Sequence, residues 1–447
     1  MPAPSLPPGP RAPRPVQTLA WGLRPMGFMR RCHDRHGDMF TMRIASEGTW
    51  VFVAHPDPVK QVFTGDPAAF HAGEANTILL PVLGPSSVLL LDDAAHMRQR
   101  KLLLPPFHGD RMEAYGELMR DIAREEVARW PAHEPIPLVH RMQAITLEVI
   151  MRAVFGVEQG PRLDRLRVAL RHLLELSVDW RRMAVLAFLG PERAQRLRAF
   201  TKVKEPVDAL LFEEIAERRD APGLAERDDI LSLLVQARDE DGNPMTDSEL
   251  RDELMTLLVA GHETTATSLA WAFERLVRHP QVLARLVAEI EAGEDDAYLD
   301  AVVKETLRLR PVLPIVIRRL TEPTEVGGRL LPAGAGVVPC IHLLHRRPDV
   351  YPDPHRFRPE RFLEQPPGTY TWIPFGGGTR RCLGASFAQF EMKQVLSALL
   401  TEAAPVTTSA PHEPVGRRAI TLSPARGGVV TLAPRGDRAR LGALAAR

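Results

Sequence analysis

Cysteine is scarce in this chain of 447 residues, which contains only Cys32, Cys340 and Cys382. An odd number of widely spaced cysteines excludes a disulfide framework and fits a reducing compartment. No second Cys or His stands two to four residues from Cys382, where a closed tetrahedral zinc site would need one. The sequence therefore predicts free thiols and no zinc at Cys382.

Long apolar runs and an excess of one charge are also missing. No stretch approaches the roughly 18 apolar residues that a membrane span needs, and the start of the chain is rich in proline. The formal net charge is +1, which gives no reason to expect nucleic acid or an anionic membrane as a partner. We expect a cytoplasmic protein with no membrane span.

What the chain does contain is a glycine-rich loop with a cysteine, FGGGTRRCLG, at residues 375–384. Consecutive glycines let the backbone lie flat against a planar ligand, because no Cβ intervenes. The apolar spacing of residues 385–401 predicts a helix directly after Cys382, and the free amides and dipole of a helix N-terminus favour a thiolate. Such a thiolate suits an axial ligand of haem iron, and a reduced structural cysteine beside a turn is the alternative.

Five residues of this loop form the pattern F-x-x-G-x-R-x-C-x-G, namely Phe375, Gly378, Arg380, Cys382 and Gly384. The pattern resembles the haem-thiolate signature of the cytochrome P450 family, and its five fixed positions make it specific. The resemblance implies that Cys382 is the metal ligand and that Phe375, Gly376, Arg380 and Gly384 help to bind the cofactor. That cofactor would be haem b, bound without covalent attachment, because the sequence has no C-x-x-C-H motif.

The two propionates of haem need charged or hydrogen-bonding partners when they are buried. His96 and Arg100 lie at i and i+4 of an expected helix and resemble the propionate-binding pair of the family. Arg318, at the end of an apolar segment, and Arg380 are the further candidates. A solvated basic helix face is the alternative for His96 and Arg100.

A long helix is predicted over residues 246–279, because Thr246 and Glu249 form a capping box and Pro280 follows. The middle of this helix, AGHETTAT at 260–267, is a poor helix former, which indicates a use other than stability. AGHETT resembles the acid–alcohol motif of the family, with Glu263 and Thr264 as the catalytic pair. Thr264 would hold reduced dioxygen and an ordered water, and Glu263 would connect that water to solvent. A threonine ridge used for tight packing is the alternative.

Glu305 and Arg308 lie at i and i+3 of a predicted helix over residues 300–310. An exposed pair of this kind would mean little by itself. Together with Arg361 of the later PERF sequence, the pair resembles the structural triad of the family. We expect this triad to hold the cysteine loop in place and to take no part in the chemistry.

Apolar residues near the expected cofactor would form a pocket for a lipophilic substrate. Residues 72–91 are predicted to be a loop, which by resemblance would roof this pocket, and an apolar loop packed as core is the equal alternative. Residues 311–317 are predicted to be a strand that lines the pocket. A break at residues 190–191 would be the hinge of a mobile lid, by resemblance alone. The candidate pocket residues are Val82, Leu83, Val259, Ala260, Leu313 and Val316.

The sequence thus predicts a mainly α fold with a small β portion, including strands at 39–44 and 50–53 and a terminal hairpin of 419–422 with 429–432. The expected organisation is an N-terminal segment (1–29), a cytochrome P450 haem domain (30–434) and a basic tail (435–447). The resemblance implies a monomeric monooxygenase that hydroxylates or epoxidises a lipophilic molecule. Electrons would come from a separate ferredoxin or flavodoxin with its reductase. A peroxygenase or isomerase of the same fold and a non-catalytic haem sensor are the rival functions.

Overall fold

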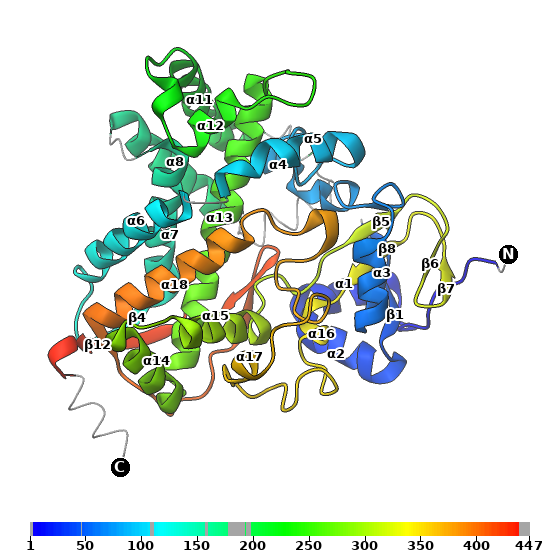
Figure 1. Cartoon of the computed structure of the whole chain (residues 1–447). Helices are drawn as coiled ribbons and strands as arrows, with labels where there is room; N and C mark the ends of the chain where they lie inside the picture. The colour runs from blue at the N-terminus through cyan, green and yellow to red at the C-terminus, as the bar shows by residue number, and fades with distance from the viewer. Residues whose placement is uncertain are drawn as a thin grey trace.

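The computed structural model describes residues 3–45, 47–107, 111–156, 160–177, 193 and 198–437. Helices dominate this part of the chain, and a small sheet lies at one side of them (Figure 1). The long helix α13 (Asp247–Leu276) runs through the middle of the helical part, where α15 (Ala297–Leu309) and α18 (Ala385–Glu402) pack against it. The predicted mainly α fold with a small β portion is confirmed.

The other α-helices of the described chain are α1 (Arg14–Leu23), α2 (Pro25–His36), α3 (Pro56–Thr64), α4 (Leu80–Leu83), α5 (Asp93–Leu103), α6 (Arg111–Val127), α7 (Leu138–Phe155), α8 (Pro161–Ser177), α11 (Arg198–Arg219), α12 (Ile230–Gln236), α14 (Pro280–Ala292), α16 (Ile341–Leu344) and α17 (Arg361–Glu364). Two of the short 3₁₀ helices matter for the site, η1 (Glu74–Leu79) and η4 (Gly378–Arg380). The predicted break at residues 190–191 lies outside the described residues.

The strands are β1 (Met39–Ile44), β2 (Gly48–Val53), β3 (Phe70–His71), β4 (Pro135–Pro137), β5 (Arg318–Leu320), β6 (Thr324–Val326), β7 (Arg329–Leu331), β8 (Gly336–Pro339), β9 (Ala403–Pro405), β10 (Val415–Arg418), β11 (Thr421–Pro424) and β12 (Val429–Pro434). The largest sheet has the order β1-β2-β8-β5-β3, in which β2 and β8 are parallel and the other pairs antiparallel. Its first two strands lie where the sequence predicts a small sheet.

Helix α13 begins where the capping box predicts. The Glu249 N–H donates to Thr246 Oγ1 at 3.2 Å, and the Thr246 N–H donates to Glu249 Oε2 at 2.7 Å. The helix ends at Leu276, slightly before the predicted end at residue 279, and Pro280 opens α14. Thirty residues give α13 a length of about 45 Å, so that it crosses the core of the helical part.

The N-terminal segment is packed against the sheet and does not stand apart from it. The Thr41 N–H of β1 donates to the carbonyl of Pro8 at 2.9 Å, and Gln17 Nε2 donates to the carbonyls of Pro10 and Ala12. Helix α2 spans residue 30, the predicted start of the haem domain. The structure therefore shows no break in the chain at that position.

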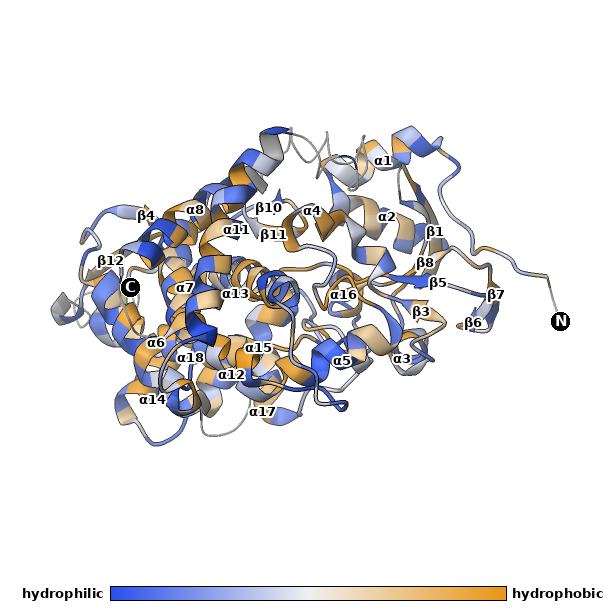
Figure 2. Ribbon diagram, turned by 90° about the horizontal axis from the view of Figure 1, so that it is seen from above, coloured by the Kyte–Doolittle hydropathy of each residue, from blue (hydrophilic) through white to orange (hydrophobic). Residues whose placement is uncertain are grey.

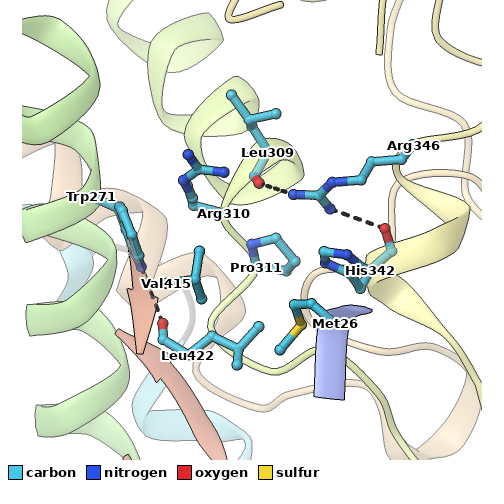
Figure 3. Close-up of a pocket in the computed structure, with 9 residues that line it drawn as sticks. All are labelled: Met26, Trp271, Leu309, Arg310, Pro311, His342, Arg346, Val415 and Leu422. Atoms are coloured by element: carbon cyan, nitrogen blue, oxygen red, sulfur yellow. Dashed lines mark hydrogen bonds between the residues drawn. The ribbon is translucent and has the colours of Figure 1, made fainter. Parts of the chain in front are cut away.

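Residues 311–317 do not form the predicted strand, and β5 begins only at Arg318. Pro311 and Pro314 lack the N–H groups that a strand ladder uses, which explains the difference. The segment is fixed by single bonds instead, such as that from the Leu422 N–H to the Val312 carbonyl at 2.7 Å. Figure 3 shows Pro311 in this region, lining a small cavity with Leu422 of β11 and Trp271 of α13.

The predicted terminal hairpin has the wrong partners. Strand β11, over Thr421–Pro424, pairs with β10, with Arg418 opposite Thr421. Strand β12 pairs instead with β4 and β9, which lie far away in the sequence. Sequence proximity favoured one hairpin, but the ladder of β12 is completed by segments that carry no strong strand pattern.

Candidate active site

The cysteine loop closes on itself just before α18. The Cys382 N–H donates to the Phe375 carbonyl at 3.0 Å, and the Arg381 N–H donates to the Gly378 carbonyl at 3.1 Å. Gly384 is the N-cap residue of α18. The loop therefore presents Cys382 close to the start of a helix, as the sequence predicts.

The three glycines of the loop serve different purposes. A Cβ on Gly377 would lie 2.3 Å from the ring of Phe63, and one on Gly378 would lie 2.0 Å from the Phe63 carbonyl oxygen. Gly378 also has a φ of +66°, which favours glycine. Close packing against α3 thus explains two of the three glycines, which the sequence analysis explained by a planar ligand alone. On Gly376 the nearest atom to such a Cβ would be Val316 Cγ1 at 4.0 Å.

Cys382 is exposed, whereas Cys32 and Cys340 are buried. The exposure is that of the residue as a whole, because burial of the thiol raises the pKa of Cys382. The N–H of Gly384 and the charges of Arg100 and Arg381 act in the opposite direction but do not outweigh desolvation. The prediction of a thiolate favoured by the helix N-terminus is therefore wrong for the free thiol. A coordinated metal ion would remove the proton outright.

The four predicted propionate ligands come together from three segments of the chain. His96 and Arg100 belong to α5, a largely hydrophilic helix (Figure 2), Arg318 begins β5 and Arg380 ends η4. Burial and the positive charges of Arg380, Arg100 and Arg318 lower the pKa of His96 to about 4. His96 is therefore neutral near pH 7 and can donate a hydrogen bond without adding a charge.

Arg318 is the side chain of this group that is most clearly short of a partner. It is 6% exposed, and its guanidinium donates only to the Ile317 carbonyl among the described residues. Burial, with the charge of Arg380, lowers the pKa of Arg318 to about 10. A buried cation of this kind requires a counter-anion.

The charges around this cluster match those of haem. Asp92, which pairs with Arg380, is the carboxylate within the group, and it also accepts bonds from the N–H groups of Ala72, Gly73 and Glu74. Asp93 also acts on Arg380 and Arg381 on Arg100, so positive charge remains in excess around the cluster. The two propionates of haem would neutralise this excess, and the thiol of Cys382 offers a ligand to the iron. The residues present therefore fit the group.

Helix α13 has an accessible strip in the middle of its otherwise mostly buried length. Ala260 is exposed, and Gly261 and Thr264 are partly exposed. Thr264 Oγ1 donates to the Ala260 carbonyl at 2.6 Å, the i−4 bond that the sequence predicts, and the helix continues without a break. Small side chains thus leave room beside the helix at the point where the Thr264 hydroxyl lies.

Glu263 is 12% exposed and has a partner for each carboxylate oxygen. Gln143 Nε2 of α7 donates to Glu263 Oε2 at 2.5 Å, and Arg418 Nε of β10 lies 3.1 Å from Glu263 Oε1. Burial raises the pKa of Glu263, while Arg418, Gln143 and His140 oppose this shift. The sequence did not indicate Gln143 or Arg418, because both are far from the acid–alcohol motif along the chain.

The three residues of the predicted triad meet in the core. Arg308 donates to both oxygens of Glu305, at 2.6 Å and 2.9 Å, and Arg361 Nε donates to Glu305 Oε1 at 3.2 Å. Arg308 also donates to the carbonyl of His345 at 2.7 Å. His345 Nε2 in turn accepts from the N–H of Ile373 at 2.9 Å, just before the cysteine loop. His345, which sequence analysis missed, thus links the triad to the loop.

The predicted pocket residues differ in accessibility. Ala260 is exposed, Val82, Val259, Leu313 and Val316 are partly buried, and Leu83 is 2% exposed. The roof predicted as a loop over residues 72–91 contains η1 and α4. Polar groups of α13 anchor it, since Asp252 accepts from the Ser86 N–H and Glu253 from the Val88 N–H, each at 2.8 Å.

Among the residues that the structure describes, no helix is long and apolar enough to cross a membrane.

The family model for cytochrome P450 matches residues 7–407. Cytochrome P450 135B1 of Mycobacterium tuberculosis is 46% identical over 430 residues, which cover 94% of this chain and 90% of that protein. Cytochrome P450 137 of the same species is 40% identical over 423 residues, or 94% and 87% of the two chains. A solved structure of retinoic acid-bound cyanobacterial CYP120A1 shares the fold with a TM-score of 0.80 at 24% identity, over 96% of this chain and 100% of the other. The chain therefore belongs to the cytochrome P450 family of haem-thiolate monooxygenases.

Proposed function

We propose that the protein inserts one atom of O2 into a lipophilic small molecule, by hydroxylation or epoxidation. The two electrons come from a separate ferredoxin or flavodoxin with its reductase. The observation that carries this proposal is the group of three guanidiniums, with Asp92 as the carboxylate among them, beside the exposed Cys382. Its excess positive charge requires a dianionic ligand next to a sulfur donor.

That ligand is haem b, held without a covalent link. Arg100, Arg318, Arg380 and His96 bind the propionates, Cys382 ligates the iron, and Phe375, Gly376 and Gly384 shape the loop around it. Haem with a thiolate ligand supplies the reductive activation of dioxygen. The Glu305, Arg308 and Arg361 triad keeps the loop in position through His345 and Ile373.

Proton delivery is the task of Glu263 and Thr264. The Thr264 hydroxyl lies on the accessible strip of α13, where it can exchange its bond to Ala260 for one to an ordered water. Glu263, one residue before it, carries a proton from solvent to that water and is then protonated again. This pair favours a monooxygenase over a peroxygenase or isomerase of the same fold, which would have no need to protonate dioxygen.

The substrate lies against the strip of α13 and the apolar residues around it. Ala260, Val259, Leu313, Val316 and Val82 are accessible enough to contact it. Leu83 supports the roof from within, because its side chain is buried and its carbonyl accepts a bond from Arg251 at 2.9 Å. A lining of this kind selects for apolar shape.

Two measurements test the proposal. The reduced protein with carbon monoxide should show the absorption band of thiolate-ligated haem, and Cys382→His should replace it with that of a nitrogen-ligated haem. Ligands that shift the haem absorption band should then be oxidised when NADPH, a reductase and a surrogate ferredoxin are supplied. If no bound ligand yields a product, the protein is a haem-binding sensor and the proposed activity is wrong.

A further inference from the structure

The carboxylate of Glu263 is held by two other elements before any reaction begins. Gln143 of α7 donates to Oε2, and Arg418 of β10 forms an ion pair with Oε1. The Arg418 contact at 3.1 Å is an ion pair without hydrogen-bond geometry, so that Oε1 and Arg418 Nε each lack a hydrogen-bond partner among the described residues. Oε1 is therefore buried beside a positive charge and still has a lone pair available for a proton.

Strand β10 is fixed independently of Glu263. It pairs with β11, and the Leu422 carbonyl of β11 accepts from Trp271 Nε1 of α13 at 3.1 Å (Figure 3). Trp271 lies eight residues after Glu263, or about 12 Å further along the same helix. The hairpin is thus attached to α13 at one point and presents Arg418 to it at another.

Arg417, the neighbour of Arg418 on β10, contacts Trp21 of α1. The guanidinium of Arg417 lies 5.7 Å from the ring centroid of Trp21, and Arg417 Nη1 donates to the Trp21 carbonyl at 3.5 Å. Successive side chains of a strand point to opposite faces. Arg417 therefore contacts α1 while Arg418 contacts α13, which makes Arg417 a matched control for Arg418.

Burial and the groups around Glu263 shift its pKa in opposite directions. Burial favours the neutral acid, whereas Arg418 of β10, Gln143 of α7 and His140 of α7 favour the carboxylate. His262, the adjacent histidine on α13, is buried with a pKa lowered to about 4 and is neutral near pH 7. Arg418 is thus the strongest of the groups that keep Glu263 able to give up a proton.

We propose that Arg418 and Gln143 are positioning residues for Glu263, which fix its carboxylate for proton transfer to the water at Thr264. This inference rests on the proposed role of Glu263 in proton delivery. In the transfer, the Glu263 O–H bond breaks, its proton passes to the water, and the water passes one of its own protons on to the reduced dioxygen beside Thr264. The resulting carboxylate is stabilised by Arg418 until a proton from solvent restores the acid. Neither residue touches the substrate or the reacting oxygen.

The first test measures the acid directly and needs no turnover. Infrared difference spectra recorded across a pH titration would follow the protonated carboxyl of Glu263, which is identified by its loss in Glu263→Gln. Arg418→Gln should move the midpoint of this band to higher pH by about one unit or more, because the carboxylate loses its cation. Arg418→Lys should restore most of the shift, and Arg417→Gln should leave the midpoint unchanged. An unchanged midpoint in folded Arg418→Gln protein would overturn the inference.

The second test measures coupling, the fraction of consumed NADPH that appears as product. Arg418→Gln and Gln143→Leu should lower coupling several-fold and increase the solvent deuterium isotope effect, while KM for the substrate stays the same. If Glu263→Gln itself leaves coupling unchanged, the proposed role of Glu263 fails, and the infrared result still decides whether Arg418 controls its proton. If Glu263→Gln lowers coupling but the two positioning variants do not, the proposed function stands and this inference is wrong.

Discussion

Arg308 and Glu305 form a two-bond ion pair in which neither side chain has any exposed surface. The three remaining donors of Arg308 go to the carbonyls of His345, Pro354 and Arg356, so the guanidinium is fully used. A buried pair of this kind gives little net stability over apolar residues, but its loss leaves an uncompensated charge in the core. Because Arg308 is linked to the cysteine loop through His345 and Ile373, the loss of this pair should lower haem content as well as stability.

Arg308→Ala should therefore lower the free energy of unfolding by about 3–5 kcal/mol, because Glu305 is left buried without its main partner. Urea denaturation measures this change, and the ratio of haem to protein measures the effect on the loop. Arg358→Ala removes an exposed partner of Glu364 and should cost below about 1 kcal/mol. Similar losses for both variants would contradict the structural role of the triad.

Arg318→Gln should weaken the retention of haem by roughly 10- to 150-fold, since one charge-assisted bond is worth about 1.5–3 kcal/mol. Transfer of haem to an acceptor protein gives the dissociation rate. Arg319→Gln is the control, because Arg319 donates instead to the carbonyls of Glu47 and Gly334. Equal rates for the two variants would remove Arg318 from the cofactor site.

Thr264→Ala should uncouple the reaction. Product formation should fall by about tenfold or more, and the amount of released peroxide should rise to match. The hydroxyl that is lost is the one on the accessible strip of α13. Ser268→Ala removes a comparable i−4 hydroxyl bond, to the Thr264 carbonyl at 2.9 Å, one turn further along and out of solvent. Peroxide assays on both variants should show uncoupling in Thr264→Ala alone.

The stability of the protein should fall as the pH drops from about 6.5 to about 4, partly because of His262. This side chain is buried, and burial lowers its pKa from 6.5 to about 4. Over this range the unfolded chain binds a proton that the folded protein excludes, so the free energy of unfolding rises with pH. His262→Gln should remove up to about 3 kcal/mol of this dependence. Denaturation at pH 4.5 and 7 measures it, with the exposed His172→Gln as control, and an unchanged pH slope would contradict the prediction.

Local patterns predicted the elements that carry the site. The capping box at Thr246 and Glu249 marked the start of α13, and the apolar spacing after Cys382 marked α18. The side chains of Glu305, Arg308 and Arg361 were expected together from a resemblance of motifs, and they contact one another. Such features depend on residues close in sequence or on a pattern shared with a family.

Features set by tertiary packing could not be predicted in this way. The strand expected over residues 311–317 fails because Pro311 and Pro314 leave gaps in its hydrogen-bonding row. Strand β12 pairs with β4 and β9, and no local sequence pattern specifies partners so distant along the chain. Desolvation of Cys382 and the contacts of Arg418 likewise depend on what surrounds each group in space.

The closeness of Phe63 to Gly378 has a consequence for how the protein matures. The seat of the cysteine loop is built by α3, near the beginning of the chain, while the loop itself is synthesised after about four-fifths of the residues. Most of the polypeptide must therefore be synthesised before the cysteine loop can pack on α3 and Cys382 can bind iron. Capture of the prosthetic group belongs to the last stage of biogenesis, after a helix made early and a loop made late have met.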